Sequence, residues 1–321
     1  MILVTGATGF VGRALCASLC ERGPLRISVR KRVAGEWPEG VDVVQASLSP
    51  DQDWTGSMPG VNVVVHCAAR VHMMKDRAAD PLAEFRRVNV EGTLRLARQA
   101  AEAGVRRFVS LSSIKVNGDY SQPGRPFTVD QHPEPGDPYA VSKCEAEAGL
   151  RVVSQDTGME VVIIRPPLVY GPGVEANFLA MMRWLSSGIP LPLGGITENR
   201  RSLVFLDNLV DLIVACIYHP AAANRTFLVS DDEDLSTAAL LRRLAAALGR
   251  PARLLPLPAG LIALGAKLVG RPGIAQRLCD SLQVDISNTK ALLGWSPPVS
   301  VDEGLRRVAE DWLRNGSGCL I

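Results

Sequence analysis

Tyr139 and Lys143 are the pair of residues in this sequence whose types and spacing point most directly to chemistry. They lie four positions apart in the run GDPYAVSKCEAE, and at helical spacing their side chains share one face. A phenol, with an ordinary pKa of about 10, needs a nearby positive charge to act near neutral pH. A lysine ammonium and a cationic nicotinamide would both supply it. The pair predicts proton exchange with a substrate hydroxyl or carbonyl during hydride transfer, although the spacing alone also fits two ordinary helix residues.

Two serines, Ser112 and Ser113, close a predicted strand in the run FVSLSSIKVNG. In open α/β sheets ligands bind at the carboxyl ends of the strands, so a hydroxyl there can bond the reacting oxygen of a substrate. We expect Ser113 to have this role. Ser112 fits equally well a residue that only caps a loop.

The glycines Gly6, Gly9 and Gly12 follow the first apolar run, in MILVTGATGFVG, and open a helical pattern. A dinucleotide site requires this order, because glycines let the backbone approach a pyrophosphate whose charge the helix N-terminus attracts. The spacing is GxxGxxG rather than GxGxxG, and a structural turn could use the same residues. Because the turn follows the first strand, we expect it to bind a dinucleotide.

The end of the second predicted strand bears on which dinucleotide this is. A carboxylate there takes the ribose 2′-hydroxyl of NAD, whereas an arginine accommodates the 2′-phosphate of NADP. The run RISVRKR places Arg30 at this position, followed by two further basic residues and no carboxylate. This favours NADP(H) and leaves NAD(H) possible, the alternative being an ordinary solvated basic turn.

Alternating strands and helices must position the glycine turn, the two serines and the Tyr139/Lys143 pair. Short β-rich runs alternate with helical runs through the first half of the chain, which predicts an α/β fold with a Rossmann-like, doubly wound parallel sheet. Beyond the run YGPG the strands become fewer, proline is more frequent, and one helix is bounded by Ser236 and Gly249. We expect residues 1–171 to form the dinucleotide-binding domain, with a later contribution from about 202–230. Residues 172–321 should form mainly a smaller C-terminal α/β substrate lobe.

Composition narrows the class of protein. The chain has 321 residues, with 35 basic and 33 acidic side chains interleaved, so its net charge of +2 gives no sign of nucleic-acid binding. The seven cysteines lack metal-ligand spacing, and no secretory segment precedes the first strand. We therefore expect reduced thiols, no metal and a cytoplasmic location.

The most apolar stretch, residues 254–270, is broken by prolines and Lys267 and is too short to span a bilayer, so we expect no transmembrane segment. For this stretch a buried helix is favoured over a membrane-surface contact, because it is short and lacks a basic face.

The motifs occur together in an order that resembles the extended short-chain dehydrogenase/reductases. The resemblance spans nearly the whole chain. The motifs that carry it are the glycine turn, HCAA at 66–69, NVEGT at 89–93, SS before VNG, the Tyr139/Lys143 pair and RPPLVYGPG at 165–173. Within that superfamily the sequence looks like the nucleotide-sugar epimerases and dehydratases, including UDP-glucose 4-epimerase-like enzymes. SSIKVNG resembles the corresponding run of reductases that act on UDP-2-acetamido-2,6-dideoxy-4-hexulose.

The resemblance implies a role for each matching residue. Tyr139 would be the general acid/base, Lys143 would bind the nicotinamide ribose and lower the tyrosine pKa, and Ser113 would orient the sugar oxygen, while Asn89 supports the active-site helix. The residues expected at the cofactor are Gly6, Thr8, Gly9, Phe10, Val11, Gly12, Arg30, Ala68, Ala69, Asn89, Tyr139, Lys143 and Pro166. Those expected at the substrate are His72, Lys115, Asn117, Asn177, Arg201 and Arg277, with the neighbouring Arg200 less favoured than Arg201 and Arg271 as the alternative to Arg277.

The expected function is reduction of the 4-keto group of a UDP-4-keto-6-deoxy-N-acetylhexosamine. The alternative is a UDP-hexose or UDP-N-acetylhexosamine 4-epimerase, which uses the same residues but returns the hydride to the opposite face of the sugar. A reductase of an apolar, steroid-like substrate is a third possibility, and Asn177 and Arg201 argue against it because such a substrate gives phosphate donors no role. Relatives of this kind often pair through two helices, so a homodimer is possible.

Overall fold

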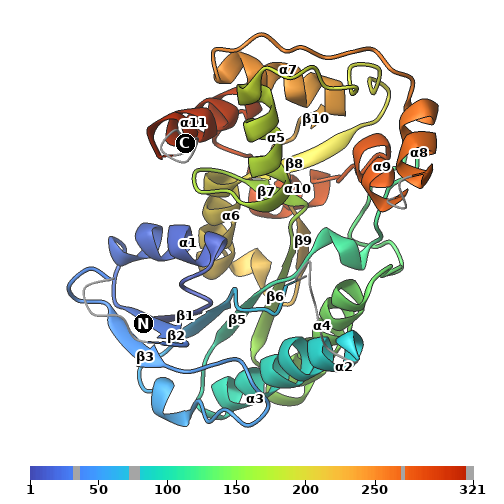
Figure 1. Ribbon diagram of the computed structural model, residues 1–321. Helices are drawn as coiled ribbons and strands as arrows, with labels where there is room; N and C mark the ends of the chain where they lie inside the picture. The colour runs from blue at the N-terminus through green and yellow to red at the C-terminus, as the bar shows by residue number, and fades with distance from the viewer. Residues whose placement is uncertain (32–36, 72–79, 269–271, 316–321) are drawn as a thin grey trace.

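The computed structural model of the chain describes residues 1–31, 37–71, 80–268 and 272–315. Figure 1 shows two lobes, the larger built around a parallel sheet and the smaller built mainly from the C-terminal part of the chain. The chain passes between the lobes more than once, because β9 of the larger lobe follows β8 of the smaller one.

A seven-stranded sheet forms the centre of the larger lobe, with all neighbouring strands parallel and the order β3-β2-β1-β4-β5-β6-β9. The direction of winding reverses between β1 and β4, which confirms the predicted doubly wound fold. The strands are β1 (Ile2–Thr5), β2 (Leu25–Val29), β3 (Asp42–Gln45), β4 (Val63–His66), β5 (Arg107–Leu111), β6 (Glu160–Arg165) and β9 (Thr226–Leu228).

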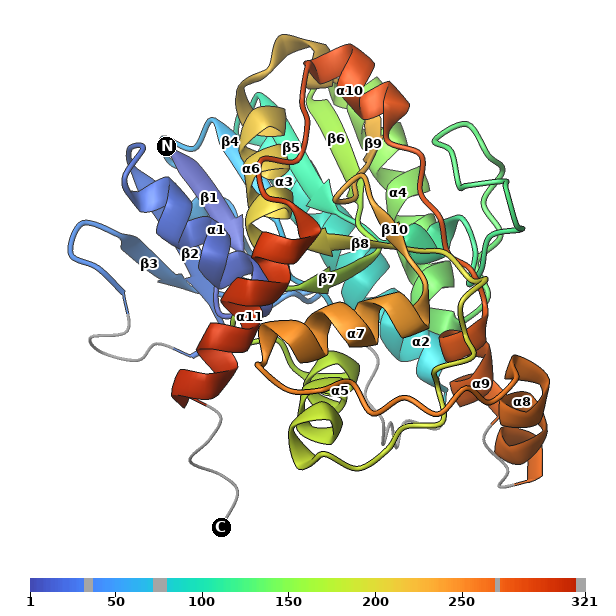
Figure 2. The same cartoon turned by 90° about the horizontal axis from the view of Figure 1, so that it is seen from above.

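Helices cover both faces of this sheet, so its central strands are continuous apolar runs such as VVVH in β4. On one face α1 (Phe10–Cys20) packs against α6 (Leu206–Tyr218). On the other, α3 (Thr93–Glu102) packs against α4 (Pro138–Thr157), as Figures 1 and 2 show. The chain enters α3 through α2 (Pro81–Phe85) and a π-helical stretch (Arg86–Gly92), and short 3₁₀ turns occupy Thr55–Ser57, Ile114–Val116 and Pro220–Ala222.

The smaller lobe contains a three-stranded sheet in the order β10-β8-β7, with β8 parallel to β7 and antiparallel to β10. Its strands are β7 (Leu168–Tyr170), β8 (Arg201–Phe205) and β10 (Asp234–Leu235), and its helices are α5 (Ala176–Ser187), α7 (Thr237–Ala247), α8 (Ala259–Leu268), α9 (Pro272–Cys279) and α11 (Val301–Asn315). A further helix, α10 (Ser287–Leu293), contacts β9 of the larger lobe. Helix α7 begins as predicted, since Ser236 Oγ accepts a hydrogen bond from the Ala239 N–H at 3.1 Å.

The apolar stretch 254–270 differs from its prediction. Its helix, α8, is not buried: Leu261 and Leu264 on the helix are exposed, and so are Leu255 and Leu257, which precede it. Apolarity indicates a tendency to be buried but does not supply a neighbour, and α8 packs chiefly against α9 at the edge of the lobe. The prediction of a buried helix is therefore wrong.

Candidate active site

The turn between β1 and α1 is shaped for close backbone approach. Gly6 has φ +71°, and a Cβ added there would lie 2.6 Å from the Ala68 nitrogen. At Gly12 an added Cβ would lie 2.0 Å from the Gly6 carbonyl oxygen. Helix α1 begins after Gly9, which has no side chain to cap the first N–H groups of the helix, and Thr8 is exposed beside them. These residues fit a dinucleotide, because uncapped N–H groups at a tight glycine turn can bond a pyrophosphate.

Replacing Gly12 with alanine is expected to weaken dinucleotide binding by about tenfold or more, since an overpacked site costs about 1–3 kcal/mol. The new methyl group meets a backbone oxygen at 2.0 Å, and the turn must shift to accept it. The measurement is calorimetric titration with NADH and NADPH. Gly56→Ala is the matched control, because its added Cβ meets nothing within 4 Å. Equal Kd values for both variants would contradict this account of the turn.

His66, the first residue of HCAA, ties the turn to the neighbouring elements. Its Nδ1 lies 2.7 Å from Thr5 Oγ1 on β1, and its Nε2 lies 3.0 Å from Thr93 Oγ1 on α3. Burial lowers the pKa of His66 to about 3, so the ring is neutral and structural. Ala68 and Ala69 follow at the carboxyl end of β4, beside the glycine turn.

Arg30 follows β2 directly and is exposed at the same edge of the sheet as the glycine turn. Its carbonyl accepts a hydrogen bond from Gln45 Nε2 on β3 at 3.4 Å, which links the two strand ends. Lys31 beside it is also exposed. The strand end therefore presents positive charge where the adenosine ribose is expected.

Tyr139 and Lys143 lie in the first turns of α4, which Asp137 caps by accepting a hydrogen bond from the Ala140 N–H at 2.8 Å. The Nζ atom of Lys143 donates to the carbonyl of Leu111, the last residue of β5, at 2.6 Å. Burial lowers the pKa of Lys143 to about 8, although Glu147 and then Cys67 act in the opposite direction. The ammonium is thus fixed at the carboxyl edge of the sheet.

The surroundings of the Tyr139 hydroxyl favour its neutral, protonated form. Burial, reinforced by Asp137, raises the pKa of Tyr139 to about 12, and its ring meets Phe85 edge-on at 6.0 Å between centroids. Burial and the Asp137 charge therefore act against the lowering of the Tyr139 pKa that the resemblance implies. The form present is the proton donor.

The two serines after β5 have different surroundings. Ser113 is partly exposed, and its Oγ accepts only a 3.3 Å hydrogen bond from the Lys115 N–H, so its hydroxyl proton can go to a substrate oxygen. Ser112 is buried and donates to a Glu147 carboxylate oxygen at 2.6 Å. Lys115 forms ion pairs with Asp137 and, at 3.3 Å, with Asp119.

A buried network of polar side chains lies beneath the carboxyl edge of the sheet that carries Ser113 and Lys143. Glu147 receives the Ser112 hydroxyl and pairs with Arg165 of β6 at 2.6 Å. Arg165 also donates to Asn117 Oδ1 at 2.9 Å, and Asn117 Nδ2 donates to the Thr128 carbonyl at 2.9 Å. Asn117 is fully buried, so the expectation that it lines the sugar is corrected: its amide is used to complete the network. Glu147 and Arg165 were not predicted from the sequence.

Asn89 connects the cofactor side to α4. Its Nδ2 donates to Ser142 Oγ and to the Arg70 carbonyl, both at 3.0 Å, and its Oδ1 accepts the Arg70 N–H at 2.8 Å. Ser142 precedes Lys143 on α4. Asn89 therefore holds the segment after Ala69 against the helix that carries the reactive pair.

On the substrate side, Arg201 begins β8 and donates from Nη1 to the Asp280 carbonyl at 3.0 Å. Burial lowers the pKa of Arg201, with Asp280 acting in the opposite direction. Pro166 is buried and its carbonyl accepts the Ile114 N–H at 2.9 Å. His72 lies outside the described residues, and the side chains of Asn177, in α5, and Arg277, in α9, are likewise outside the described part.

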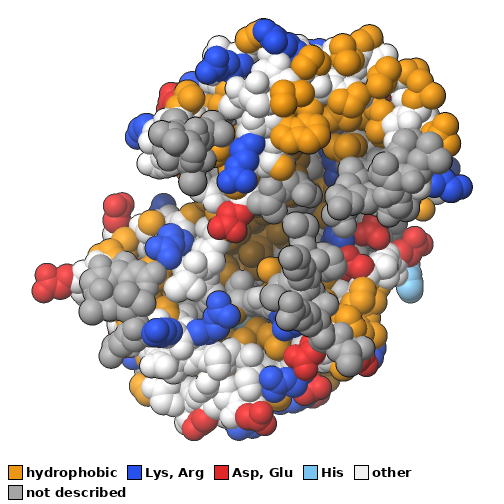
Figure 3. Space-filling model, viewed as in Figure 1, with side chains coloured by type: hydrophobic (Ala, Val, Ile, Leu, Met, Phe, Trp, Pro, Cys, Tyr) orange, Lys and Arg blue, Asp and Glu red, His pale blue; other side chains and the backbone are white. Residues whose placement is uncertain are grey.

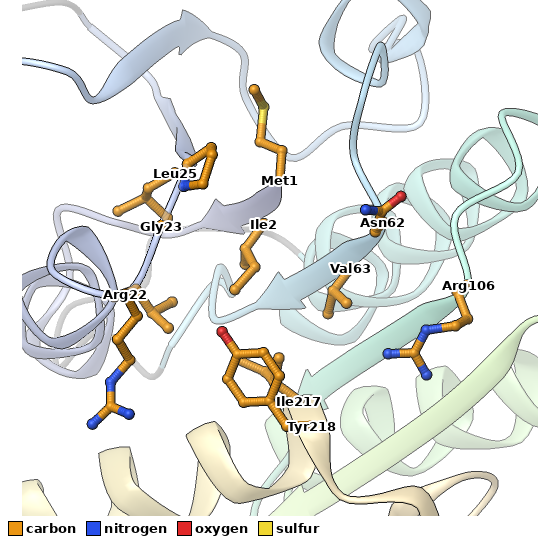
Figure 4. Close-up of a pocket in the computed structure, with 12 residues that line it drawn as sticks. Met1, Ile2, Arg22, Gly23, Leu25, Asn62, Val63, Arg106, Ile217 and Tyr218 are labelled. Atoms are coloured by element: carbon orange, nitrogen blue, oxygen red, sulfur yellow. The ribbon is translucent and has the colours of Figure 1, made fainter.

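A separate hollow of about 470 Å³ lies at the opposite edge of the sheet, where the amino ends of β1, β2 and β4 meet the end of α6 (Figure 4). Arg22, Arg106 and Tyr218 stand around it. Of these, Arg106 pairs with Glu160 at 2.9 Å. None of the predicted site residues lines this hollow, so the reactive pair and the glycine turn belong to the other edge.

The fold and the site together define an enzyme of the extended short-chain dehydrogenase/reductase class. Residues 2–230 match the NAD dependent epimerase/dehydratase family, and the chain belongs to it, as the motif order predicted. It is 49% identical over 313 residues to a UDP-glucose 4-epimerase of Vibrio cholerae, covering 98% of this chain and 95% of that protein.

Two solved structures show the same architecture. A short-chain dehydrogenase/reductase superfamily protein from Agrobacterium tumefaciens with bound NAD has a TM-score of 0.77 at 26% identity, covering 99% of this chain and 98% of the other. A UDP-glucuronic acid 4-epimerase from Bacillus cereus in complex with NAD has a TM-score of 0.79 at 21% identity, with the same coverage.

Proposed function

We propose that this chain reduces the 4-keto group of a UDP-4-keto-6-deoxy-N-acetylhexosamine, with NADP(H) preferred over NAD(H). The observation that carries the proposal is the placement of the Tyr139/Lys143 pair at the same sheet edge as the glycine turn, with Arg30 at the end of β2. An exchangeable NADPH suits a reductase, because each turnover consumes one hydride.

Each side chain has a distinct task in this proposal. The bound nicotinamide supplies the hydride to C4. As the 4-carbonyl oxygen gains negative charge, the neutral Tyr139 hydroxyl donates its proton to it and Ser113 donates a hydrogen bond. Lys143, held by the Leu111 carbonyl, binds the ribose and stabilises the phenolate that Tyr139 becomes.

The UDP part of the substrate is assigned from charge and from the relatives. The names of the V. cholerae and B. cereus proteins identify UDP-sugars as their substrates. In this chain Arg201 offers a partly buried guanidinium suited to a diphosphate. We propose Asn177 and Arg277 as further diphosphate contacts and His72 and Lys115 as contacts to the sugar.

A UDP-sugar 4-epimerase is the second candidate, and the 49% identity to the V. cholerae enzyme favours it. The same residues would serve, but the ketone intermediate would rotate and take the hydride back on its other face. The cofactor would then return to its starting state in every turnover. The two candidates therefore differ in whether the dinucleotide leaves the protein.

The experiment is to purify the full chain without added cofactor, denature it, and identify any released nucleotide by chromatography. An empty protein that binds NADPH reversibly and more tightly than NADH supports the reductase. Near-stoichiometric NAD supports the epimerase and overturns the reductase. The empty protein would next be assayed with a 4-ketosugar, following oxidation of NADPH by its absorbance.

Replacing Arg201 with alanine is expected to raise the Kd for UDP by about tenfold or more, since a hydrogen bond to a charged group contributes about 1.5–3 kcal/mol. Isothermal titration with UDP measures this. Arg200→Ala is the matched control, because this neighbour is exposed and donates instead to the Thr197 and Asn199 carbonyls. A UDP affinity that Arg201→Ala leaves unchanged removes Arg201 from the diphosphate site.

The described cysteines, Cys16, Cys20, Cys67, Cys144, Cys216 and Cys279, are free thiols. Reduced thiols agree with the cytoplasmic location that we propose for the enzyme, since oxidising compartments favour disulfides.

A further inference from the structure

The smaller lobe carries a surface that the proposed reaction does not use. Figure 3 shows hydrophobic side chains gathered across this lobe, over the region of α5 and α8. Six large apolar side chains there are between 39% and 65% exposed, and we call them the leucine face: Trp184, Ile189, Leu255, Leu257, Leu261 and Leu264. A gathering of this kind on a folded protein marks an interaction site more often than an isolated exposed leucine does.

Backbone pairing holds part of the leucine face outward. The Leu191 N–H donates to the Arg253 carbonyl and the Leu255 N–H donates to the Leu191 carbonyl, both at 2.8 Å. Along this paired segment Leu254 packs against the core of the lobe, and Leu255, the next residue, points the other way and is exposed. At Gly195 an added Cβ would lie 2.2 Å from the Leu257 carbonyl oxygen, so the two segments are in close contact. The exposure of Leu255 and Leu257 is therefore built into the lobe.

Helix α8 extends this surface. Leu261 and Leu264 are three residues apart on α8, so they share one face of the helix, and Leu257 lies just before the helix begins. The described contacts of α8 are chiefly with α9. Leu261 and Leu264 are therefore exposed to solvent.

The two segments that carry the leucine face are basic, although Arg243 in the second segment pairs with Glu233 and Asp302. Residues 176–197 and 235–279, which contain the face, carry eight basic and no acidic residues, although the whole chain has 35 basic and 33 acidic ones. Arg183, Arg250, Arg253 and Lys267 are exposed. A second copy docking face to face would bring like charges together, whereas an anionic surface would be attracted.

We propose that the leucine face docks the enzyme on an anionic lipid bilayer. Large apolar side chains, a tryptophan, and exposed arginine and lysine side chains are the combination that binds at the boundary between headgroups and acyl chains. Among the described residues no helix is long and apolar enough to cross a membrane, so the contact lies on the surface. Binding should be reversible and should weaken as salt screens the basic residues.

The test is co-sedimentation of the full chain, with NADPH added, with vesicles of phosphatidylcholine alone or mixed with phosphatidylglycerol. Wild type should bind the mixed vesicles and bind them less at high salt. Leu261→Ser/Leu264→Ser should lower the partition coefficient by about tenfold or more, because two exposed leucines no longer enter the lipid. Lys267→Glu should lower it on mixed vesicles only. Leu313→Ser on α11, 51% exposed and outside the leucine face, is the matched control and should bind as wild type.

Circular dichroism melts and NADPH titration would first show that each variant is folded. The proposal is overturned if wild type does not sediment with the mixed vesicles, or if Leu313→Ser loses as much binding as the double variant. It is also overturned if light scattering shows a wild-type dimer that the double variant converts to a monomer, since the occupant would then be a second copy.

Discussion

Tyr139→Phe is expected to reduce kcat by about 10²- to 10⁴-fold, the range that a positioned acid or base contributes, with the Kd for NADPH almost unchanged. The variant removes one oxygen from a ring that packs edge-on against Phe85, so the shape of the site is preserved. In the proposed reaction, the variant lacks the proton that Tyr139 gives to the sugar oxygen as C4 receives hydride. Steady-state kinetics with the 4-ketosugar, paired with calorimetric titration of the cofactor, measures both quantities.

Tyr218→Phe is the control for this experiment, because Tyr218 is exposed at the opposite edge of the sheet. It should retain wild-type kcat. A Tyr139→Phe enzyme that also turned over at a near-normal rate would mean that another group delivers the proton. A large loss of NADPH affinity would instead assign Tyr139 to binding.

Glu147→Ala is expected to lower the free energy of unfolding by about 3–5 kcal/mol, the usual cost of removing one partner of a buried ion pair. Glu147 and Arg165 are both almost fully buried, and their closest N–O distance is 2.6 Å. Without the carboxylate, the Arg165 guanidinium would remain in the core with its charge uncompensated, and Ser112 would lose its acceptor. Urea denaturation followed by circular dichroism measures the change.

Glu145→Ala is a close control, two residues earlier on the same helix. Glu145 also pairs with an arginine, Arg86, at 2.6 Å, but both side chains are partly exposed, so the loss should be at most about 1 kcal/mol. Comparable losses in the two variants would show that the buried network contributes no more than a surface pair.

The parts of the site that could be predicted are those encoded over short stretches. The glycine turn can be predicted because Gly6, Gly9 and Gly12 lie between a strand and a helix. The Tyr139/Lys143 pair can be predicted because the two residues are one helical turn apart. Arg30 could be placed because it ends a short β-rich run. In each case the residues that define the feature are neighbours in the sequence, so the pattern and the geometry coincide.

The support beneath the site could not be predicted in this way. Ser112 follows β5, Glu147 lies on α4 and Arg165 lies on β6, and their side chains meet only after the sheet has formed. Asn117 was misplaced for the same reason, because its position in SSIKVNG does not reveal that Arg165 occupies its amide oxygen. The prediction that α8 is buried failed for a different reason. An apolar sequence shows which residues favour burial, but it does not show whether another element of the fold covers them.

Strand β9 has a consequence for how the chain unfolds. It lies beside β6 in the main sheet, although β7, α5 and β8 of the other lobe lie between β6 and β9 in the sequence. A fragment ending at residue 170 would lack both β9 and the α6 helix that packs on α1, so it would expose a sheet edge and an apolar face. We therefore expect the two lobes to unfold together, so that a ligand that binds either of them raises the unfolding free energy of the entire chain.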